Sequence, residues 1–547
     1  MPNIFTIGQS ALSAAQAGIN TAGQNIANAS TVGYSRQTVV QTAATPQALG
    51  YGFIGQGTQV VDVQRNYNDY LGTQVLAANS ASSQLETQHT QASLIDNMLA
   101  DPSAGLSPAM QSLFGSLQEM SASPSDVATR QMFLSNAQSL VSRFHDVGER
   151  LDNIRQGLNL QITSGVQSIN AASQQLASLN LAIDSAQGVA GGKASNDLLD
   201  QRNQVLLDLS KQVKVTVSEQ NGQYSVFIGN GQPLVVGGQA HALKVLPSPT
   251  DTTRLEVAYD TSGQKSIMSS NNLAGGILGG LLEFRSQILE PTQNELGRIA
   301  LALGSQFNSI NAQGATPSGA TGGNIFSLPP MTVAPNSANT GTASLSATLA
   351  NVSKLTTSDY RLQRVDSKFV LSRSSDNVIL KSSADFTEIQ AAATEQGFAL
   401  ASTGLMKDGD EFKISPTAQV ASRIEVALSS VNGIAAAATA QSPGDNSNIL
   451  KMLDLQTAKV LDGGNQSLQS AYAQTVSRIG SKTHELDVTS TSAQQILTQA
   501  QRAVQDVSGV NLDEEAANLL RYQQAYQAAG KVMQIAKQMF DSLLQMN

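Results

Sequence analysis

The feature that most constrains the fold of this chain is an apolar stripe between residues 507 and 547. Positions three and four residues apart are apolar or small there, namely Leu519, Tyr522, Tyr526, Ala529, Met533, Ala536, Phe540 and Leu543. This spacing predicts a helix with a coiled-coil seam along one side. Asn511 and the acidic residues at 513–515 suit the start of that helix and its dipole. At about 1.5 Å per residue, the helix would be about 50 Å long.

The N-terminal end of the chain carries a matching stripe. Its members are Phe5, Gly8, Leu12, Ala15, Ile19, Ala22, Ile26 and Ala29. Neither stripe is as wide as the apolar face of an ordinary core helix. We therefore expect the two ends to pair with each other and with copies of themselves. The alternative is that both are surface helices docked on a separate core.

The composition favours long helices over a deep binding pocket. With 547 residues the chain should hold more than one domain. It is 41% hydrophobic but only 13% charged and 4% aromatic, and it has no Trp. Substrate pockets are usually lined by aromatic side chains, so this bias suits helices with small-residue seams and large polar surfaces.

Several classes of function are disfavoured. The net charge is -9 and no basic run stands out, so nucleic acid is not an expected partner. The chain has no Cys, which excludes a disulfide framework or a thiolate metal site. No apolar run approaches the length of a membrane span. The first basic side chain is Arg36, so the start of the chain does not read as a secretory signal, and export would need another route.

Helical periodicity covers most of the chain outside two β-rich parts. The longest helix is expected at about 126–187. Two others are expected at 196–211 and 278–312, and two more begin near residues 71 and 446. Period-two alternation with Asn-Gly turns predicts a small β insert. The expected class is a multidomain α+β protein. Its domains are a terminal coiled coil (1–40 and 508–547), a long-helix bundle (41–210, 263–325 and 433–507), a β-hairpin insert (211–262) and an outer β-rich domain (326–432).

A search for chemistry finds no catalytic, cofactor-binding or metal-binding residues to predict. The four histidines are dispersed and none forms an H-E-x-x-H pattern. Gly530-Lys531 is not a phosphate loop because Val532 replaces the required Ser or Thr. The acidic residues at 408–411 lack the spacing of a calcium loop.

Motifs at both ends resemble those of the bacterial flagellar axial proteins. The first is Asn25-x-x-Asn28-x-x-Thr31-x-Gly33-Tyr34, and the second runs from Val510-Asn511-Leu512-Asp513 through Tyr522-Gln-Gln-Ala-Tyr526. The continuation Tyr34-Ser35-Arg36-Gln37 points, within that group, to the hook-associated protein 1 family of first hook–filament junction proteins. Asp200-Gln-Arg202 and Gly279-Gly-Leu-Leu-Glu-Phe-Arg285 support this similarity.

The resemblance implies a non-enzymatic structural protein of the flagellum. Copies would form a ring between the hook protein and the second hook–filament junction protein. Terminal helices would line the inner tube, long helices the next shell, and β domains the outside. The flagellar type III export apparatus would secrete the chain from the cytoplasm after a chaperone has bound its C-terminal helical region. The implied assembly residues are Leu12, Ile19, Asn25, Ile26, Asn28, Thr31, Gly33, Tyr34, Arg36, Leu519, Tyr522, Tyr526, Met533, Phe540 and Leu543.

Three other readings stay open at this point. The chain could be another axial component, such as a hook or rod protein. It could also be a secreted adhesin with residues 330–432 as its binding module, and an enzyme hidden in that β-rich segment is a third possibility.

Overall fold

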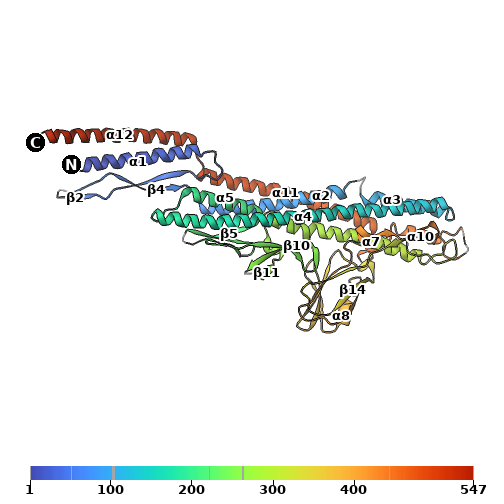
Figure 1. The fold of residues 1–547 in the computed structure, drawn as a ribbon. Helices are drawn as coiled ribbons and strands as arrows, with labels where there is room; N and C mark the ends of the chain where they lie inside the picture. The colour runs from blue at the N-terminus through green and yellow to red at the C-terminus, as the bar shows by residue number, and fades with distance from the viewer. Residues whose placement is uncertain are drawn as a thin grey trace.

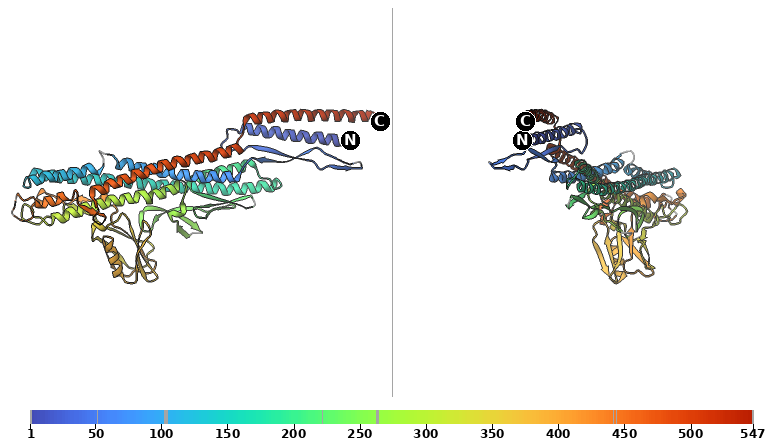
Figure 2. Two further views of the ribbon diagram at one scale, coloured as in Figure 1. Left: turned by 180° about the vertical axis from the view of Figure 1, so that it is seen from behind. Right: turned by 60° about the vertical axis from the view of Figure 1, so that its left-hand side comes forward.

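The computed structural model describes residues 2–50, 52–101, 105–220, 222–261, 264–440, 442 and 444–545. The molecule is long and thin: a rod of parallel and antiparallel helices carries a helix pair displaced at one end and a β domain projecting from its side (Figure 1). Figure 2 shows the same three parts from behind and from the end. This is the multidomain α+β architecture that we predicted. Within the described residues, no helix combines the length and apolarity needed to cross a membrane.

The two chain ends form an antiparallel helix pair. Helix α1 (Pro2–Ala27) lies along α12 (Leu512–Gln545), and both termini lie at the same end of the molecule (Figure 1). A long two-stranded ribbon of β1 (Gln37–Ala43) and β4 (Thr58–Arg65) covers the other side of α1. The ribbon ends in a hairpin of β2 (Gln47–Leu49) and β3 (Gly52–Ile54).

The rod is built from long helices that bury one continuous apolar core. They are α2 (Asp69–Leu99), α3 (Leu106–Ala122), α4 (Val127–Val189), α5 (Asn196–Gln212), α6 (Gly276–Phe284), α7 (Glu290–Asn311), α10 (Ser447–Asp454) and α11 (Leu468–Ser508). Helix α4 has 63 residues and matches the long helix predicted at 126–187. Helix α11 packs on α2, which also contacts α5 and α6. Phe307 contacts the rings of Phe114, Phe133 and Phe326, and so ties three helices to the start of the outer segment.

The helix predicted at 278–312 is interrupted. A π-helical turn, η2 (Arg285–Leu289), separates α6 from α7. Pro291 explains the break, because proline has no N–H to donate and its ring crowds the carbonyl four residues earlier. Widening the preceding turn relieves that crowding. Similarly, α10 and α11 are separated by a short ribbon, β21 (Lys459–Leu461) and β22 (Gln466–Ser467).

The β insert predicted at 211–262 covers one side of α4 and extends to residue 267. Its first sheet contains β5 (Val215–Gln220), β6 (Gln223–Ile228), β7 (Gln232–Val236) and β8 (Gln239–Ala240). Its second sheet contains β9 (Leu243–Ser248), β10 (Asp251–Thr261) and β11 (Gln264–Ile267). Gly229 and Gly231 have positive φ in the turn between β6 and β7, as the Gly-Asn-Gly sequence predicts.

The projecting domain has a five-stranded antiparallel sheet in the order β13-β19-β15-β16-β17. These strands are β13 (Thr332–Pro335), β15 (Tyr360–Val365), β16 (Lys368–Arg373), β17 (Ile379–Ser383) and β19 (Glu411–Ser415). A second ribbon pairs β14 (Ser344–Leu349) with β18 (Phe398–Thr403), next to helix α8 (Phe386–Glu395).

The chain between the sheet and the rod forms short elements. They are β12 (Phe326–Ser327), η3 (Val352–Lys354), α9 (Val420–Arg423), β20 (Glu425–Val426), η4 (Val431–Gly433) and η5 (Asp462–Gly464), with η1 (Ser270–Leu273) at the start of α6. Helix α9 and strand β20 lie against α4 and α7 rather than in the projecting sheet.

Candidate assembly surface

The helix pair at the chain ends has a tight seam of small residues. A Cβ atom built on Gly8 would lie 2.7 Å from Met533 Sδ, and one on Gly18 would lie 2.5 Å from Tyr522 Cδ1. A side chain at Gly18 would therefore collide with the Tyr522 ring, and one at Gly8 would force the flexible Met533 side chain to move. Five alanines are almost fully buried in the two helices: Ala14, Ala15, Ala22, Ala529 and Ala536. This arrangement places Tyr522 and Met533 against α1.

The other predicted seam residues are covered less completely. Leu12, Ile19, Ile26 and Leu519 are half-buried. Tyr526 and Phe540 are 42% and 52% exposed. The side chain of Leu543 lies outside the described part of the structure.

A second apolar stripe on α12 was missed by the sequence analysis. Val532, Ile535 and Met539 follow one another at three- and four-residue spacing, and Ile535 is 55% exposed. With Tyr526, Phe540 and Leu544 they leave much of the apolar surface of α12 in solvent. The sequence shows both stripes, but periodicity does not say which of them meets α1.

Asn25 is the centre of a hydrogen-bond network where the helix pair meets the rod. Its Nδ2 donates to the backbone oxygen of Gln37 at 2.9 Å and to Glu515 Oε2 at 3.1 Å. Its Oδ1 accepts from the backbone N–H of Gln37 at 2.9 Å and from the hydroxyl of Tyr34 at 2.8 Å. One fully buried side chain thus joins α1, β1 and the start of α12. We call this region, residues 25–37 with Asp200 and residues 508–515, the elbow.

Charged groups complete the elbow. Arg36 Nε pairs with Glu515 Oε1 and Arg36 Nη1 with Glu514 Oε2, both at 2.8 Å, and the backbone N–H of Arg36 donates to the Ser508 carbonyl. On the rod side, Asp200 accepts from the backbone N–H and the hydroxyl of Ser35 at 2.9 and 2.8 Å. Asp200 also pairs with Arg65 at 3.1 Å. Helix α5 and the ribbon are thereby tied to the same turn.

The remaining motif residues shape the turn itself. Asn28 donates to the backbone oxygen of Gln24, and Thr31 donates to Asn28 Oδ1. Gly33 has φ +82°, and a Cβ there would lie 2.9 Å from Gln204 Oε1, so glycine is required. The structure therefore brings Asn25, Tyr34 and Arg36 together, while Asn28 and Thr31 bond only within the turn.

The elbow perturbs the ionisation of Tyr34. Burial, followed by the nearby carboxylates of Asp197, Asp200 and Glu515, raises the pKa of Tyr34 to about 12. The hydroxyl therefore stays protonated and can donate to Asn25. Glu515 and Asp200 were not predicted as site residues, because their roles depend on contacts with distant parts of the chain.

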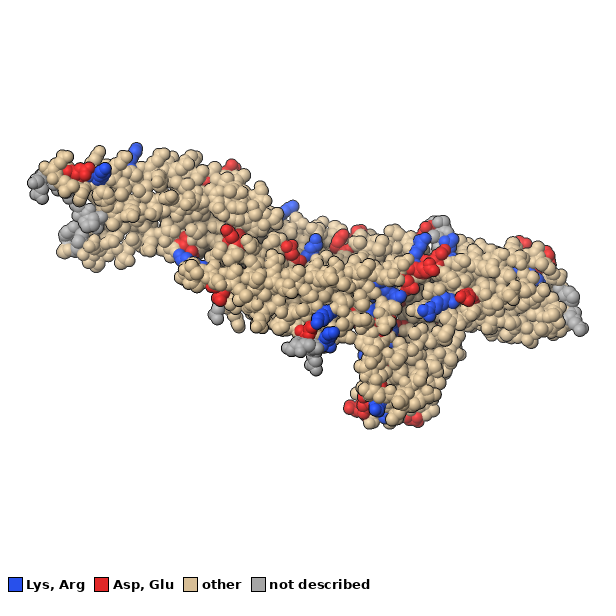
Figure 3. All heavy atoms as spheres, viewed as in Figure 1, with Lys and Arg blue, Asp and Glu red and all other residues tan. Residues whose placement is uncertain are grey.

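The rest of the surface is poor in charge. Lys, Arg, Asp and Glu are scattered singly or in small groups over the face shown in Figure 3, including the face of the helix pair. Among the described residues, no group of three His, Cys, Asp or Glu side chains is arranged to hold a metal ion.

Comparison with known proteins assigns each part of this arrangement. Residues 92–326 match the helical domain of flagellar hook-associated protein FlgK, and residues 334–422 match the D2-like domain of flagellar hook-associated protein 1. Residues 5–34 match the flagella basal body rod protein family, and residues 499–546 match the C-terminal region of the flagellar basal body rod FlgEFG proteins.

Full-length relatives agree with these assignments. Flagellar hook-associated protein 1 of Salmonella typhimurium is 37% identical over 557 aligned positions that cover 100% of both chains. The Bacillus subtilis protein of the same name is 25% identical and covers 98% of this chain and 96% of its own. The structure of the flagellar hook junction protein FlgK from Burkholderia pseudomallei superposes with a TM-score of 0.74 at 26% identity. It covers 80% of this chain and 100% of its own.

The paired terminal helices, the rod and these matches define a bacterial flagellar axial protein. More particularly, the chain belongs to the flagellar hook-associated protein 1 family. It is a structural protein of the flagellar hook–filament junction.

Proposed function

We propose that copies of this chain assemble through α1 and α12 into a ring that joins the hook protein to the second hook–filament junction protein. The observation that carries this proposal is the apolar stripe of Val532, Ile535 and Met539 on α12. Helix α1 covers the neighbouring side of α12, so much of this stripe stays in solvent. Another helix pair would bury it, and each large apolar side chain would contribute about 1.5–3 kcal/mol when fully buried.

The same proposal gives each domain a place. Terminal segments 1–40 and 508–547 would form the inner tube, the long-helix bundle (41–210, 263–325 and 433–507) the next shell, and the β parts (211–262 and 326–432) the outside. The layering supports this order, because the helix pair and the projecting β domain lie on opposite sides of the rod (Figure 1). The assembly residues named from the sequence would act in the inner layer and at the elbow.

Export follows as a further part of the proposal. The chain would remain in the cytoplasm until the flagellar type III apparatus secretes it to the growing flagellum. A chaperone bound to the C-terminal helical region would cover the exposed apolar stripe and prevent early self-association. The structural class of the family supports a chain without enzymatic activity.

The test is a double substitution on the exposed stripe. Ile535→Glu with Met539→Glu places two charges in the proposed contact and leaves Ala529 and Ala536, which face α1, unchanged. Gln538→Glu, at an exposed polar position on the same helix, is the matched control. Cells carrying the double variant should build hooks without filaments by electron microscopy and release unpolymerised filament protein, whereas control cells should be normal.

The amount of the variant protein in the medium shows whether it is exported, and so separates a failure of export from a failure of assembly. Normal filaments in cells that export the double variant would show that α12 is not an assembly element. Hooks that are themselves absent or short would instead favour the reading as a hook or rod protein. If the cells kept intact filaments but no longer attached to surfaces, the result would favour the reading as an adhesin.

A further inference from the structure

The projecting domain is attached to the rod by more than its two connecting strands. The chain leaves the rod at β13 and returns at β19, which pair directly, with Thr332 opposite Ser415. Beyond these strands, η3 and α9 contact α7, and the backbone N–H of Ser337 donates to the Pro249 carbonyl of the β insert at 3.0 Å. The contacts between the domain and the rod form two groups, which we call the backbone part and the side-chain part.

The backbone part is a close approach between residues 417–424 and two helices of the rod. A Cβ on Gly297 of α7 would lie 1.8 Å from the Thr417 carbonyl oxygen, and one on Gly148 of α4 would lie 2.8 Å from Ser422 Cβ. Gln419 adopts φ +62°, which lets the chain turn sharply onto these glycines. His145 Nε2 lies 2.6 Å from the Ile424 carbonyl oxygen. We call residues 417–424 the pivot.

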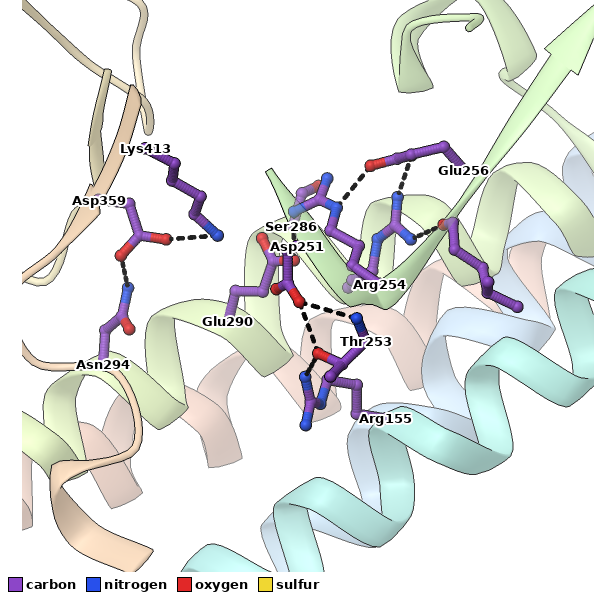
Figure 4. A network of polar contacts seen from close by, with 12 residues as sticks. Arg155, Asp251, Thr253, Arg254, Glu256, Ser286, Glu290, Asn294, Asp359 and Lys413 are labelled. Carbon is purple, nitrogen blue, oxygen red and sulfur yellow. Dashed lines mark hydrogen bonds and ion pairs between the residues drawn. The ribbon is translucent and has the colours of Figure 1, made fainter. Parts of the chain in front are cut away.

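The side-chain part lies on the same face of α7. Asn294 Nδ2 donates to the Thr357 carbonyl at 3.0 Å and to Asp359 Oδ1 at 3.3 Å, both in the projecting domain (Figure 4). Asp359 also pairs with Lys413 of β19 at 3.0 Å. One turn along α7, Arg298 donates to the Leu355 carbonyl at 3.2 Å. Asn294 is 6% exposed, so its two donor contacts are shielded from water.

A cleft of about 360 Å³ adjoins both parts: Asn294 and Asp359 line it, as do Gly148 and Gln419, together with apolar side chains such as Leu151 and Leu296. On the rod side, Arg254 pairs with Glu256 and Glu290 (Figure 4). Arg285 also pairs with Glu256. Burial opposes the charge of Lys413, but Asp359 and then Glu290 outweigh it and raise the pKa of this lysine. Glu290 on the rod thus attracts Lys413 of the projecting domain across the cleft.

We propose that Asn294 is a positioning residue that fixes the angle of the projecting domain on the rod, with residues 417–424 as the pivot. The backbone contacts at the pivot hold the domain in place. The two donor contacts of Asn294 reach residues 357 and 359, which lie outside the pivot, and so resist rotation of the domain about it. Without them, the domain stays folded and attached through the pivot, Arg298 and Ser337, but samples a wider range of angles.

The proposal is tested in the isolated full-length chain by distances between two spin labels. The chain has no native cysteine, so Ser164→Cys on α4 and Ala391→Cys on α8 provide two unique exposed labelling sites. Double electron–electron resonance then reports the distribution of rod-to-domain distances. The labelled parent chain should give one narrow peak.

The decisive variant is Asn294→Asp, which has the same shape but turns a carboxylate toward the Thr357 carbonyl and Asp359. Gln293→Glu is the matched control. It makes the same chemical change at the neighbouring residue of α7, whose side chain donates to Asp152 of α4 within the rod at 3.2 Å. We expect a broadened or second distance peak for Asn294→Asp, and a peak unchanged from the parent for Gln293→Glu.

Circular dichroism shows whether each variant is folded. If Asn294→Asp does not fold, Asn294→Ala, which only removes the two donors, decides the question in the same way. A folded Asn294 variant with the narrow peak of the parent would overturn the proposal, as would a broad distribution in the parent itself. Equal broadening by Gln293→Glu would also overturn it, because the effect would then not be specific to the contact with the domain.

Discussion

Asn25 shows why a single residue type is needed at the elbow. Its amide donates twice and its oxygen accepts twice, from groups on β1, α12 and Tyr34. An aspartate at this position has no N–H and would place a second carboxylate beside Glu515. An alanine would leave several buried polar groups without partners, each at a cost of about 1–3 kcal/mol. The elbow therefore depends on the chemistry of this residue and not on its size.

At the same scale, the elbow predicts an unusual ionisation of Tyr34. The pKa of Tyr34 in the folded chain is about 12, whereas a tyrosine in an unfolded chain has a pKa of about 10. Because the folded pKa is the higher one, the neutral hydroxyl stabilises the fold fully below about pH 10. This contribution is lost as the pH rises from about 10 to about 12.

The measurement is a titration of tyrosinate absorbance in the parent chain and in Tyr34→Phe. The difference between the two curves isolates Tyr34 and should have its midpoint near pH 12. Glu515→Gln removes one of the negative neighbours and should lower that midpoint. A difference curve centred at the pH of an exposed tyrosine would show that the elbow is not formed in solution.

The sequence contained the residues of the elbow motif but not most of their partners. Asn25, Tyr34 and Arg36 stand out through the resemblance of the N-terminal motif. Glu515 lies 479 residues from Arg36, and Asp200 lies 165 residues from Ser35. In the sequence, Glu515 stands out only as one of the acidic residues that suit the start of the C-terminal helix. No local pattern indicates that its carboxylate would be 3% exposed and shared between α1 and Arg36.

At the scale of elements, periodicity predicted the long helices because each buries one continuous stripe. The extent of α4 followed from this pattern, and its N-cap Asp126 accepts from the backbone N–H of Ala128. Interruptions were predicted less well. The π turn before α7 arises from Pro291 inside an otherwise apolar helix pattern, and the β2–β3 hairpin forms in a segment whose glycines favour a loop.

Two glycines of α4 give a prediction at this scale. A Cβ atom built on Gly157 would have no neighbouring atom within 4 Å, whereas one on Gly148 would meet the backbone and side chain of Ser422. Gly157→Ala should therefore stabilise the helix by about 0.5–1 kcal/mol, since alanine loses less backbone entropy. Gly148→Ala gains the same propensity but overpacks the pivot, at a cost of about 1–3 kcal/mol.

Urea unfolding followed by far-ultraviolet circular dichroism compares these two variants with the parent. The midpoint should rise for Gly157→Ala and fall for Gly148→Ala. Equal shifts would mean that the pivot does not press on α4, and that both glycines only weaken the helix.

At the scale of the molecule, the nested order of the chain explains how one structure can have separable parts. Both ends meet in the helix pair, the long helices lie inside them in the sequence, and the β parts are inserted in the middle (Figure 1). This order was visible in the sequence as shifts between helical and alternating periods. The angles between the parts were not, because they are set by the elbow and by the contacts of α7, where residues far apart in sequence meet.

The pairing of β13 with β19 allows the projecting domain to be removed without disturbing the rod. Thr332 and Ser415 are direct neighbours on adjacent antiparallel strands, so an Asn-Gly turn can replace residues 333–414. Residues 416–437 must remain, because α9 and β20 pack on α4, and Arg130 of α4 donates to the Ile434 carbonyl at 2.8 Å. We expect this shortened chain to keep the helical content of the rod by circular dichroism and to support filament formation and motility almost normally, since assembly rests on the chain ends.

Deleting 330–432 is the contrasting change: it removes α9 and β20 and exposes Phe326, so it should destabilise the rod. A shortened chain that folds and is exported but leaves hooks bare would show that the projecting domain takes part in assembly, and one that keeps filaments but loses surface attachment would assign it a binding role.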